Sequence, residues 1–143
     1  FSTKEDLINH LYIDIKTRIA EKMQQSLASN GAARERVRSI WFEMVGWAVE
    51  NQAEYQFKKH CEASPYISEE LRTECEAKFL PIFELFGQAA ENGLIKSLPL
   101  ELLIYLLGGT VDGFINYLKI HPEDIDNKQL WEQAYSAAWD SIR

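Results

Sequence analysis

Apolar residues recur along this chain with the period of an α-helix, and no segment alternates as a β-strand does. The clearest case runs from Val37 to Ala48, where apolar residues follow the i, i+3, i+4, i+7 spacing of one helical face. About five to six such segments follow one another along the chain. The sequence therefore predicts an all-α fold and excludes sites that need a sheet.

The first half of the chain divides into two predicted helices. The first covers residues 7–28 and ends at Asn30-Gly31, because both residues tolerate the left-handed conformation that closes a helix. The second covers about residues 32–61 and is unusually long. Pro65 then interrupts the pattern, because proline disfavours the helix at itself and at the residue before it.

Proline and capping residues organise the second half. Ser68 is a suitable cap for the next helix, and Pro81 inside that segment predicts a kink or two abutting helices. Pro99 stands where a first helical residue belongs and opens a helix to about Ile120. Asp126 is the predicted cap of the last helix.

The two final helices are more apolar than one domain of 143 residues needs. A helix that is apolar nearly all round is buried on more than one side, so we interpret the surplus as a subunit interface. Two glycines four residues apart would permit close helix approach. Packing within one chain is the alternative. The predicted interface comprises Leu106, Gly109, Gly113, Tyr117, Trp131, Tyr135, Ala138 and Trp139.

Composition and charge narrow the class of protein. The chain is 46% hydrophobic and 12% aromatic, which is typical of a globular domain rather than a disordered segment. Its formal net charge of −7 argues against phosphate-backbone binding by these residues. The longest apolar run, residues 102–107, is far shorter than a membrane span, so no membrane partner is expected.

The residues that could bind a metal ion or act in catalysis are scattered along the sequence. The three histidines form no helical di-metal pattern, and Cys61 and Cys75 form no CxxC pair. Serine, histidine and acidic residues are present without a local catalytic signature. We therefore predict no metal site, no cofactor and no enzymatic activity, and the two free cysteines fit a reducing cytoplasm.

The first seven residues, Phe1-Ser2-Thr3-Lys4-Glu5-Asp6-Leu7, place a helix cap before an acidic first turn. This segment resembles the junction that follows the N-terminal helix-turn-helix domain in TetR-family transcription regulators. The chain opens on Phe rather than Met, so an upstream portion is expected.

The second half of the chain strengthens this resemblance. The segment Glu91-Asn92-Gly93-Leu94-Ile95-Lys96, the segment that begins Leu98-Pro99-Leu100, the Gly108-Gly109 pair and the closing Trp131 and Trp139 segments are similar to the effector-binding core of that family. The resemblance implies a TetR-like C-terminal helical domain whose last two long helices form a four-helix dimer interface.

The resemblance also implies a domain organisation and a function. Residues 1–143 would form a single effector-binding and dimerisation domain, with 1–6 as the end of a DNA-binding domain and 7–28 as the connecting helix. The protein would be a homodimeric, cytoplasmic, bacterial transcriptional regulator of the repressor type. A small-molecule effector of unknown identity would alter operator DNA binding through the upstream domain. None of the residues of this chain would contact DNA.

Aromatic and methionine side chains suit an adaptable, mostly apolar ligand site. The family mechanism places this site among the second helix, the segment around Pro81 and the helix that follows Pro99. The same side chains would serve equally as plain core. The predicted ligand-binding residues are Trp41, Met44, Trp47, Tyr55, Phe83, Phe86 and Tyr105.

Two other classes of function compete with a ligand-responsive regulator. A helical protein–protein interaction module would use the apolar C-terminal pair as its docking face without sensing a small molecule. An enzyme built on a helical bundle ranks third, because no catalytic arrangement supports it.

Overall fold

The computed structural model describes residues 2–27 and 30–143, and within these residues it contains helices and no strand, which confirms the all-α prediction. Phe1 and Ala28, which belong to the predicted junction and connecting helix, lie outside the described residues. The elements are α1 (Lys4–Leu27), α2 (Ala33–Glu50), α3 (Gln52–Glu62), α4 (Glu69–Ala77), α5 (Leu80–Glu91), α6 (Leu100–Ile120), the 3-10 helix η1 (Pro122–Asp126) and α7 (Lys128–Ile142).

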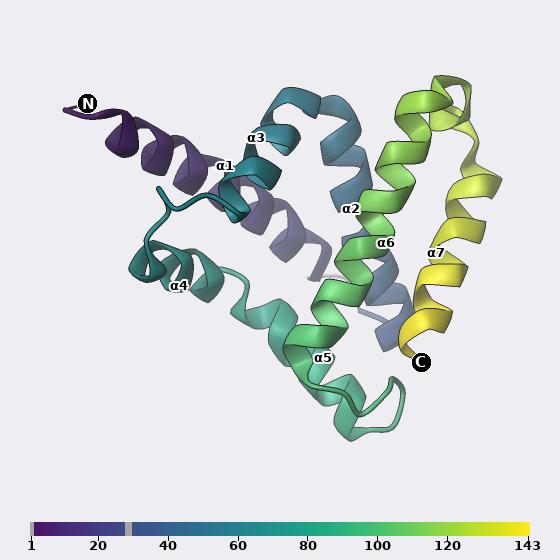
Figure 1. The fold of residues 1–143 in the computed structure, drawn as a ribbon. Helices are drawn as coiled ribbons and strands as arrows, with labels where there is room; N and C mark the ends of the chain where they lie inside the picture. The colour runs from purple at the N-terminus through teal and green to yellow at the C-terminus, as the bar shows by residue number, and fades with distance from the viewer. Residues whose placement is uncertain (1, 28–29) are drawn as a thin grey trace.

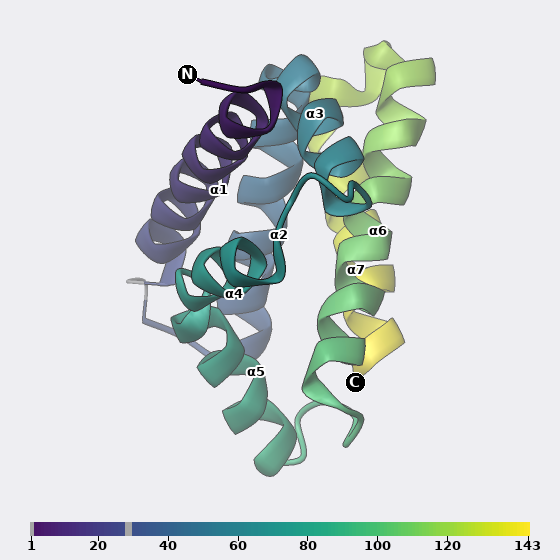
Figure 2. The same cartoon turned by 60° about the vertical axis from the view of Figure 1, so that its left-hand side comes forward.

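Helix α2 is central to the arrangement, because it packs against α1, α3, α6 and α7. Helices α6 and α7 lie side by side on one side of α2 (Figure 1). On the other side lies α1, which also packs against α3, α4 and α5 (Figure 2). The long helix α1 therefore contacts every helix of its half of the domain.

The cap predicted at the start of α1 is present. Thr3 Oγ1 accepts a hydrogen bond from the backbone N–H of Asp6 at 3.0 Å, and the Ser2 hydroxyl donates to the Asp6 carboxylate. Helix α1 begins at Lys4, so residues 4–6 belong to the same helix as the residues that follow them.

The single helix predicted over residues 32–61 is wrong, because Asn51 divides it into α2 and α3. Asn51 leaves helical geometry, with φ −128° and ψ 53°. Its backbone N–H and its side-chain Nδ2 both donate to Trp47 O, at 2.8 and 2.9 Å. The asparagine amide thus closes α2 by competing for a carbonyl of its last turn.

Two boundaries around α4 agree with the sequence. Ser68 Oγ accepts the backbone N–H of Leu71 at 3.2 Å and caps α4. Pro81 is the second residue of α5, so α4 and α5 are two abutting helices, which is one of the two predicted outcomes.

Two later boundaries differ by one residue. Pro99 precedes α6 instead of starting it. Asp126 ends η1, and the cap of α7 is Asn127, whose Oδ1 accepts the Leu130 N–H at 3.2 Å. Asp and Asn cap helices about equally well, so sequence alone does not separate neighbouring candidates.

Trp41 is the side chain that joins α2, α6 and α7. Its indole is 1% exposed, and its Nε1 donates to Thr110 Oγ1 on α6 at 3.0 Å. The ring lies 5.5 Å from Phe114 in a stacked arrangement and 5.8 Å from Tyr135 of α7 in a tilted one. One residue thus fixes three helices by packing and by a satisfied hydrogen bond.

Buried residues form two apolar clusters of unequal size. The larger cluster contains Trp41 and draws side chains from all the α-helices except α4. The smaller cluster lies where α1, α3 and α4 meet, and Phe57 packs against both clusters. Helix α1 contributes to both clusters: its first half packs in the smaller one and its second half in the larger one. The buried members of the smaller cluster are Tyr12, Cys61, Ile67, Leu71 and Cys75.

Trp41→Ala is expected to lower the free energy of unfolding by about 3–5 kcal/mol, because it removes the buried indole and leaves a cavity between three helices. Urea denaturation at one fixed protein concentration measures the change. The control is Glu43→Ala, an exposed position on the same helix, with an expected effect within about 0.5 kcal/mol. Equal stability of the two variants would contradict the central role of Trp41.

Candidate functional site

The structure brings most of the predicted ligand-binding residues together in the larger apolar cluster. Four of them are buried in it, and the half-buried Met44 packs against the same cluster. They come from α2, α3 and α5, which are the elements expected to surround an effector. The exposed fractions of the four are 1% for Trp41, 4% for Trp47, 3% for Tyr55 and 2% for Phe86.

The other two predicted ligand residues do not join this group. Phe83 of α5 is half-buried outside the larger cluster. Tyr105 of α6 is 70% exposed, so its side chain lies away from the interior cluster that holds the other predicted ligand residues. The sequence does not indicate this exposure, because the helix that carries Tyr105 is apolar on several sides. Periodicity then does not reveal which side faces the core.

Tyr55 carries an unsatisfied polar group inside this cluster. Its Oη is buried and has no hydrogen-bond partner, whereas the Trp41 indole N–H is satisfied by Thr110. Buried polar groups normally have partners, so an unpartnered hydroxyl in an aromatic cluster marks a place where a ligand or water could bind. The other such atoms among the described residues are Asn9 Oδ1, Arg36 Nε and Trp131 Nε1.

Charged side chains from α1, α3 and α6 form a group that we call the lysine seam, and Lys58 is its member next to Tyr55. The seam comprises Lys16, Lys58, Lys59, Glu62 and Asp112. Lys58 Nζ lies 5.8 Å from the Tyr55 ring centroid and 2.6 Å from Glu62 Oε1. Lys59 Nζ lies 2.7 Å from Asp112 Oδ2 and 3.7 Å from Glu62 Oε2. Burial favours the neutral Glu62 carboxyl, but the surrounding lysines outweigh burial and lower its pKa.

Lys16 differs from the other lysines of the seam, because no carboxylate of the described residues lies within 4.0 Å of it. Its Nζ instead lies 4.9 Å from the Phe79 ring centroid and 5.8 Å from that of Tyr12. Burial and the neighbouring Lys58 lower the pKa of Lys16 to about 8. The predicted site residues do not include Lys16, although it lies on the inward face of α1, one turn after Tyr12.

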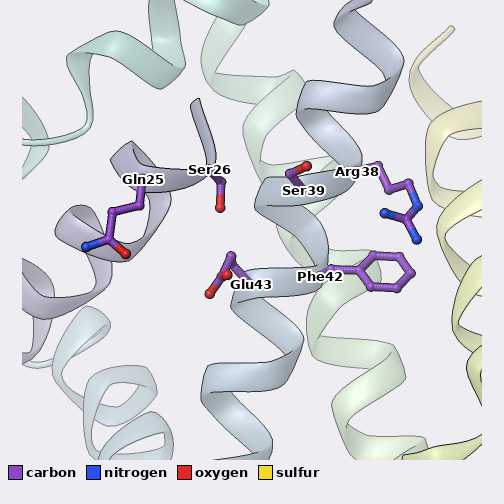
Figure 3. Close-up of a pocket in the computed structure, with 6 residues that line it drawn as sticks. All are labelled: Gln25, Ser26, Arg38, Ser39, Phe42 and Glu43. Atoms are coloured by element: carbon purple, nitrogen blue, oxygen red, sulfur yellow. The ribbon is translucent and has the colours of Figure 1, made fainter. Parts of the chain in front are cut away.

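A surface recess of about 350 Å³ lies between the last turns of α1 and helix α2 (Figure 3). Ser39 and Glu43 face the end of α1, whereas Arg38 and Phe42 point to the α7 side. The Arg38 guanidinium lies 4.1 Å from the Phe42 ring centroid and pairs with Glu132 of α7. Ligand sites are usually enclosed and mostly apolar, so this open, polar recess is a weaker candidate than the aromatic cluster.

The outer face of α6 is apolar and unpartnered in this chain. A methyl group added at Gly109 or Gly113 would meet no neighbouring part of the chain within 4 Å. The predicted interface residues Leu106 and Tyr117, each 39% exposed, lie on this same side of the helix. Leu102 and Ile120, 43% and 76% exposed, extend the face toward both ends of α6.

The predicted interface residues of α7 lie elsewhere. Tyr135, Ala138 and Trp139 are 2%, 1% and 6% exposed within the single chain. Trp131 is half-buried, and its ring lies 5.6 Å from that of Phe114. These four side chains pack against α2 and α6 of their own chain, so this structure leaves the first three no surface to offer a partner. Of the predicted α7 interface residues, Trp131 keeps the most exposed side chain.

Other chemistry is sparse in the described part of the chain. Residues 2–27 and 30–143 contain no group of three His, Cys, Asp or Glu side chains able to hold a metal ion. Both cysteines are buried, and burial raises the pKa of the Cys61 and Cys75 thiols, which disfavours the reactive thiolate. No helix of the described residues is long and apolar enough to cross a membrane.

A family model described as "Tetracyclin repressor-like, C-terminal domain" matches residues 12–143. The match covers nearly the whole chain and includes the aromatic cluster, the lysine seam and α6. The chain belongs to this family. As a TetR-like C-terminal domain, it has the fold and the family that the sequence predicted, and both are those of transcription regulators. Comparison with curated proteins gave no match.

Solved structures, two of them described as TetR-family regulators, share the fold. A TetR family transcription regulator from Marinobacter aquaeolei VT8 has a TM-score of 0.89 and 18% identity, over 99% of this chain and 74% of that one. A candidate TetR-family regulator from Shewanella sp. PV-4 has a TM-score of 0.88 and 24% identity, over 99% and 76%. A protein of unknown function from Rhodococcus sp. RHA1 has a TM-score of 0.82 and 13% identity, over 99% and 74%. Each of these chains is longer than this TetR-like domain.

Tyr55→Phe and Tyr135→Phe form a matched pair that tests the unsatisfied hydroxyl. Tyr135 Oη donates to Arg34 O at 2.5 Å, so Tyr135→Phe should cost about 0.5–1.5 kcal/mol of unfolding free energy. Tyr55→Phe should cost nothing or stabilise, because it removes a buried group without a partner. Thermal and urea unfolding measure both. A loss at Tyr55 equal to that at Tyr135 would show that its hydroxyl is satisfied.

Proposed function

We propose that this chain is the effector-binding and dimerisation domain of a ligand-responsive transcription regulator, of the repressor type, in a reducing cytoplasm. The observation that carries the proposal is the buried aromatic cluster with its unpartnered Tyr55 hydroxyl, in a domain of the TetR-like family. Its ligand would be a small molecule that lies among Trp47, Tyr55 and Phe86. The proposed protein has no catalytic activity, and the operator would be bound by an upstream helix-turn-helix domain.

The mechanism that we propose runs through α1. Residues 1–6 would close the DNA-binding domain, and residues 7–28 would connect it to the core. Helix α1 packs against α2, α3, α4 and α5, so a ligand that rearranges these helices also displaces α1. A ligand shifts the equilibrium between two positions of α1 only if it binds one of them more tightly. Displacement of α1 would separate the two DNA-binding domains of a dimer and release the operator.

Operator release is tested in a protein that joins a helix-turn-helix domain to this chain. Small molecules that raise the thermal midpoint of the chain by binding the core are expected to weaken operator affinity about tenfold, and the operator should weaken ligand affinity by the same factor. Fluorescence anisotropy with labelled DNA and calorimetry measure the two effects. Compounds that leave the thermal midpoint unchanged are the control. Operator affinity unaffected by every core ligand would overturn the mechanism.

The partner that we propose for the outer face of α6 is a second copy of the chain. Two α6 helices could approach closely at Gly109 and Gly113, because none of residues 2–27 and 30–143 comes within 4 Å of a methyl group added at either glycine, apart from the helix itself. The apolar residues on either side would then be removed from water. The same face docking onto a different protein is the alternative, and it would appear as hetero-association of a monomeric chain.

The double variant Gly109→Leu/Gly113→Leu tests this dimer. Leucine is a better helix former than glycine and meets open space within the single chain, so the fold should be retained. It would block close helix approach and raise the dimer dissociation constant by about tenfold or more. Sedimentation equilibrium at several concentrations measures this. Gly87→Leu on α5, another helical glycine with open space, is the control. A monomeric wild type, or an unchanged dissociation constant, would contradict the proposal.

A further inference from the structure

Lys16 lies at the boundary between the two apolar clusters. On α1 it follows Tyr12 of the smaller cluster by one turn and precedes Ile19 of the larger cluster by three residues. Phe57 packs against both clusters, and Phe79, which lies over the Lys16 amine, packs against the larger one. Lys16 is half-buried, and its ammonium group lies against the Phe79 and Tyr12 rings, which take the place of part of its water shell.

Of the two carboxylates that act on the Lys16 amine, Glu62 is engaged with other lysines and Glu76 is exposed on α4. Glu62 holds Lys58, and Lys59 is shared between Glu62 and Asp112. Arg72 of α4 adds a further cation near Tyr12 and donates to the backbone carbonyls of Glu62 and Ser64 instead of to a carboxylate. Although the chain carries a net charge of −7, the four cations at this boundary outnumber its three carboxylates, which are Glu62, Glu76 and Asp112.

We propose that this boundary binds an apolar organic anion, with a carboxylate as the simplest case, whose charged group pairs with Lys16 Nζ and whose hydrocarbon part packs in the aromatic cluster. The inference rests on the proposed function, because it names the class of effector for the same site. A buried cation–π contact is a weaker partner for an ammonium group than a buried carboxylate with matched geometry. The anion would replace the Phe79 ring as the partner of Lys16.

Two polar groups on α3 suit the same anion. The Tyr55 hydroxyl is buried without a partner, and Lys58 on the next turn lies 5.8 Å from the Tyr55 ring centroid. A carboxylate has two oxygens and accepts several hydrogen bonds, so it could take one from Tyr55 Oη in addition to Lys16. A neutral ligand would satisfy Tyr55 and leave Lys16 unpaired. A cationic ligand would add repulsion from Lys16 and Lys58.

The position of Phe79 suggests a route by which such a ligand would reach Lys16 and a way in which its binding would affect α1. Phe79 lies at the joint between α4 and α5, outside both helices, so its ring can move without the disruption of either helix. Helix α1 already contacts this joint, because Gln24 Nε2 donates to Lys78 O at 3.1 Å. An anion held by Lys16 at this point would couple occupancy of the site directly to α1.

The test compares decanoate with 1-decanol, which has the same hydrocarbon chain and no charge, on the 143-residue chain at neutral pH. Calorimetry is expected to show decanoate binding about tenfold tighter or more. Lys16→Met, which keeps the length of the side chain, should lose that preference and leave decanol affinity unchanged, and Lys16→Arg should restore it. Lys22→Met on the exposed side of α1 is the matched control and should behave as wild type.

A second readout follows the Lys16 amine itself. Burial and the Lys58 charge lower the pKa of Lys16 to about 8, with Glu62 and Glu76 opposing and with Cys75 and Tyr12 also facing the amine. A bound carboxylate favours the ammonium form, so decanoate should raise this pKa, measured by NMR at Cε. Decanoate affinity should be greatest below that pKa and fall as the pH rises through it. A merely structural Lys16 would show neither effect.

The outcomes separate this inference from the proposed function. Decanoate binding that is absent at millimolar concentration, equal to decanol binding or unchanged in Lys16→Met overturns the anion site. In each of these cases the proposed function is tested separately, by whether any ligand of the core releases the operator. Tight decanoate binding through Lys16 without any effect on operator affinity supports the anion site and overturns the regulatory mechanism.

Discussion

The hydrogen bond from the Trp41 indole to Thr110 is the contact on which the rest of the domain depends. It closes a site where α2, α6 and α7 meet, and the stacked Phe114 and tilted Tyr135 rings fill the space around it. A buried indole needs a partner for its N–H, so this position selects both a polar residue on α6 and a fixed rotation of that helix. Thr110 follows Gly109 directly in the sequence. The rotation of α6 that brings the Thr110 hydroxyl to the Trp41 N–H therefore also turns the face that carries Gly109 outward.

Periodicity was sufficient to predict the fold class and most of the helices. It failed at Asn51, because the apolar stripes of α2 and α3 continue onto the same core and the sequence shows no proline or glycine there. The choice between Asp126 and Asn127 as a cap also lay beyond it, since both residues are good caps in adjacent positions. Both boundaries depend on hydrogen bonds between an asparagine side chain and the backbone, which form only in the folded chain.

The candidate site was predictable in part, for reasons that differ between residues. Trp47 and Phe86 follow the apolar stripe of a helix with one polar face, so their burial could be inferred. Tyr105 could not be placed, because the surrounding helix is apolar on more than one side. Lys16 was missed for the opposite reason: a lysine among helical residues is normally solvated, and its enclosure depends on Phe79, which is distant in sequence.

The small size of the second apolar cluster has a consequence for the order in which the domain loosens. Helix α4 rests on five buried residues, two of which are cysteines, whereas the larger cluster spans six helices. Local opening draws on regions with few buried contacts, so α4 forms the natural low-stability unit of the domain. Cys61 and Cys75 gain solvent access when that unit detaches from α1. The reactivity of these two thiols would therefore show whether α4 is packed against α1.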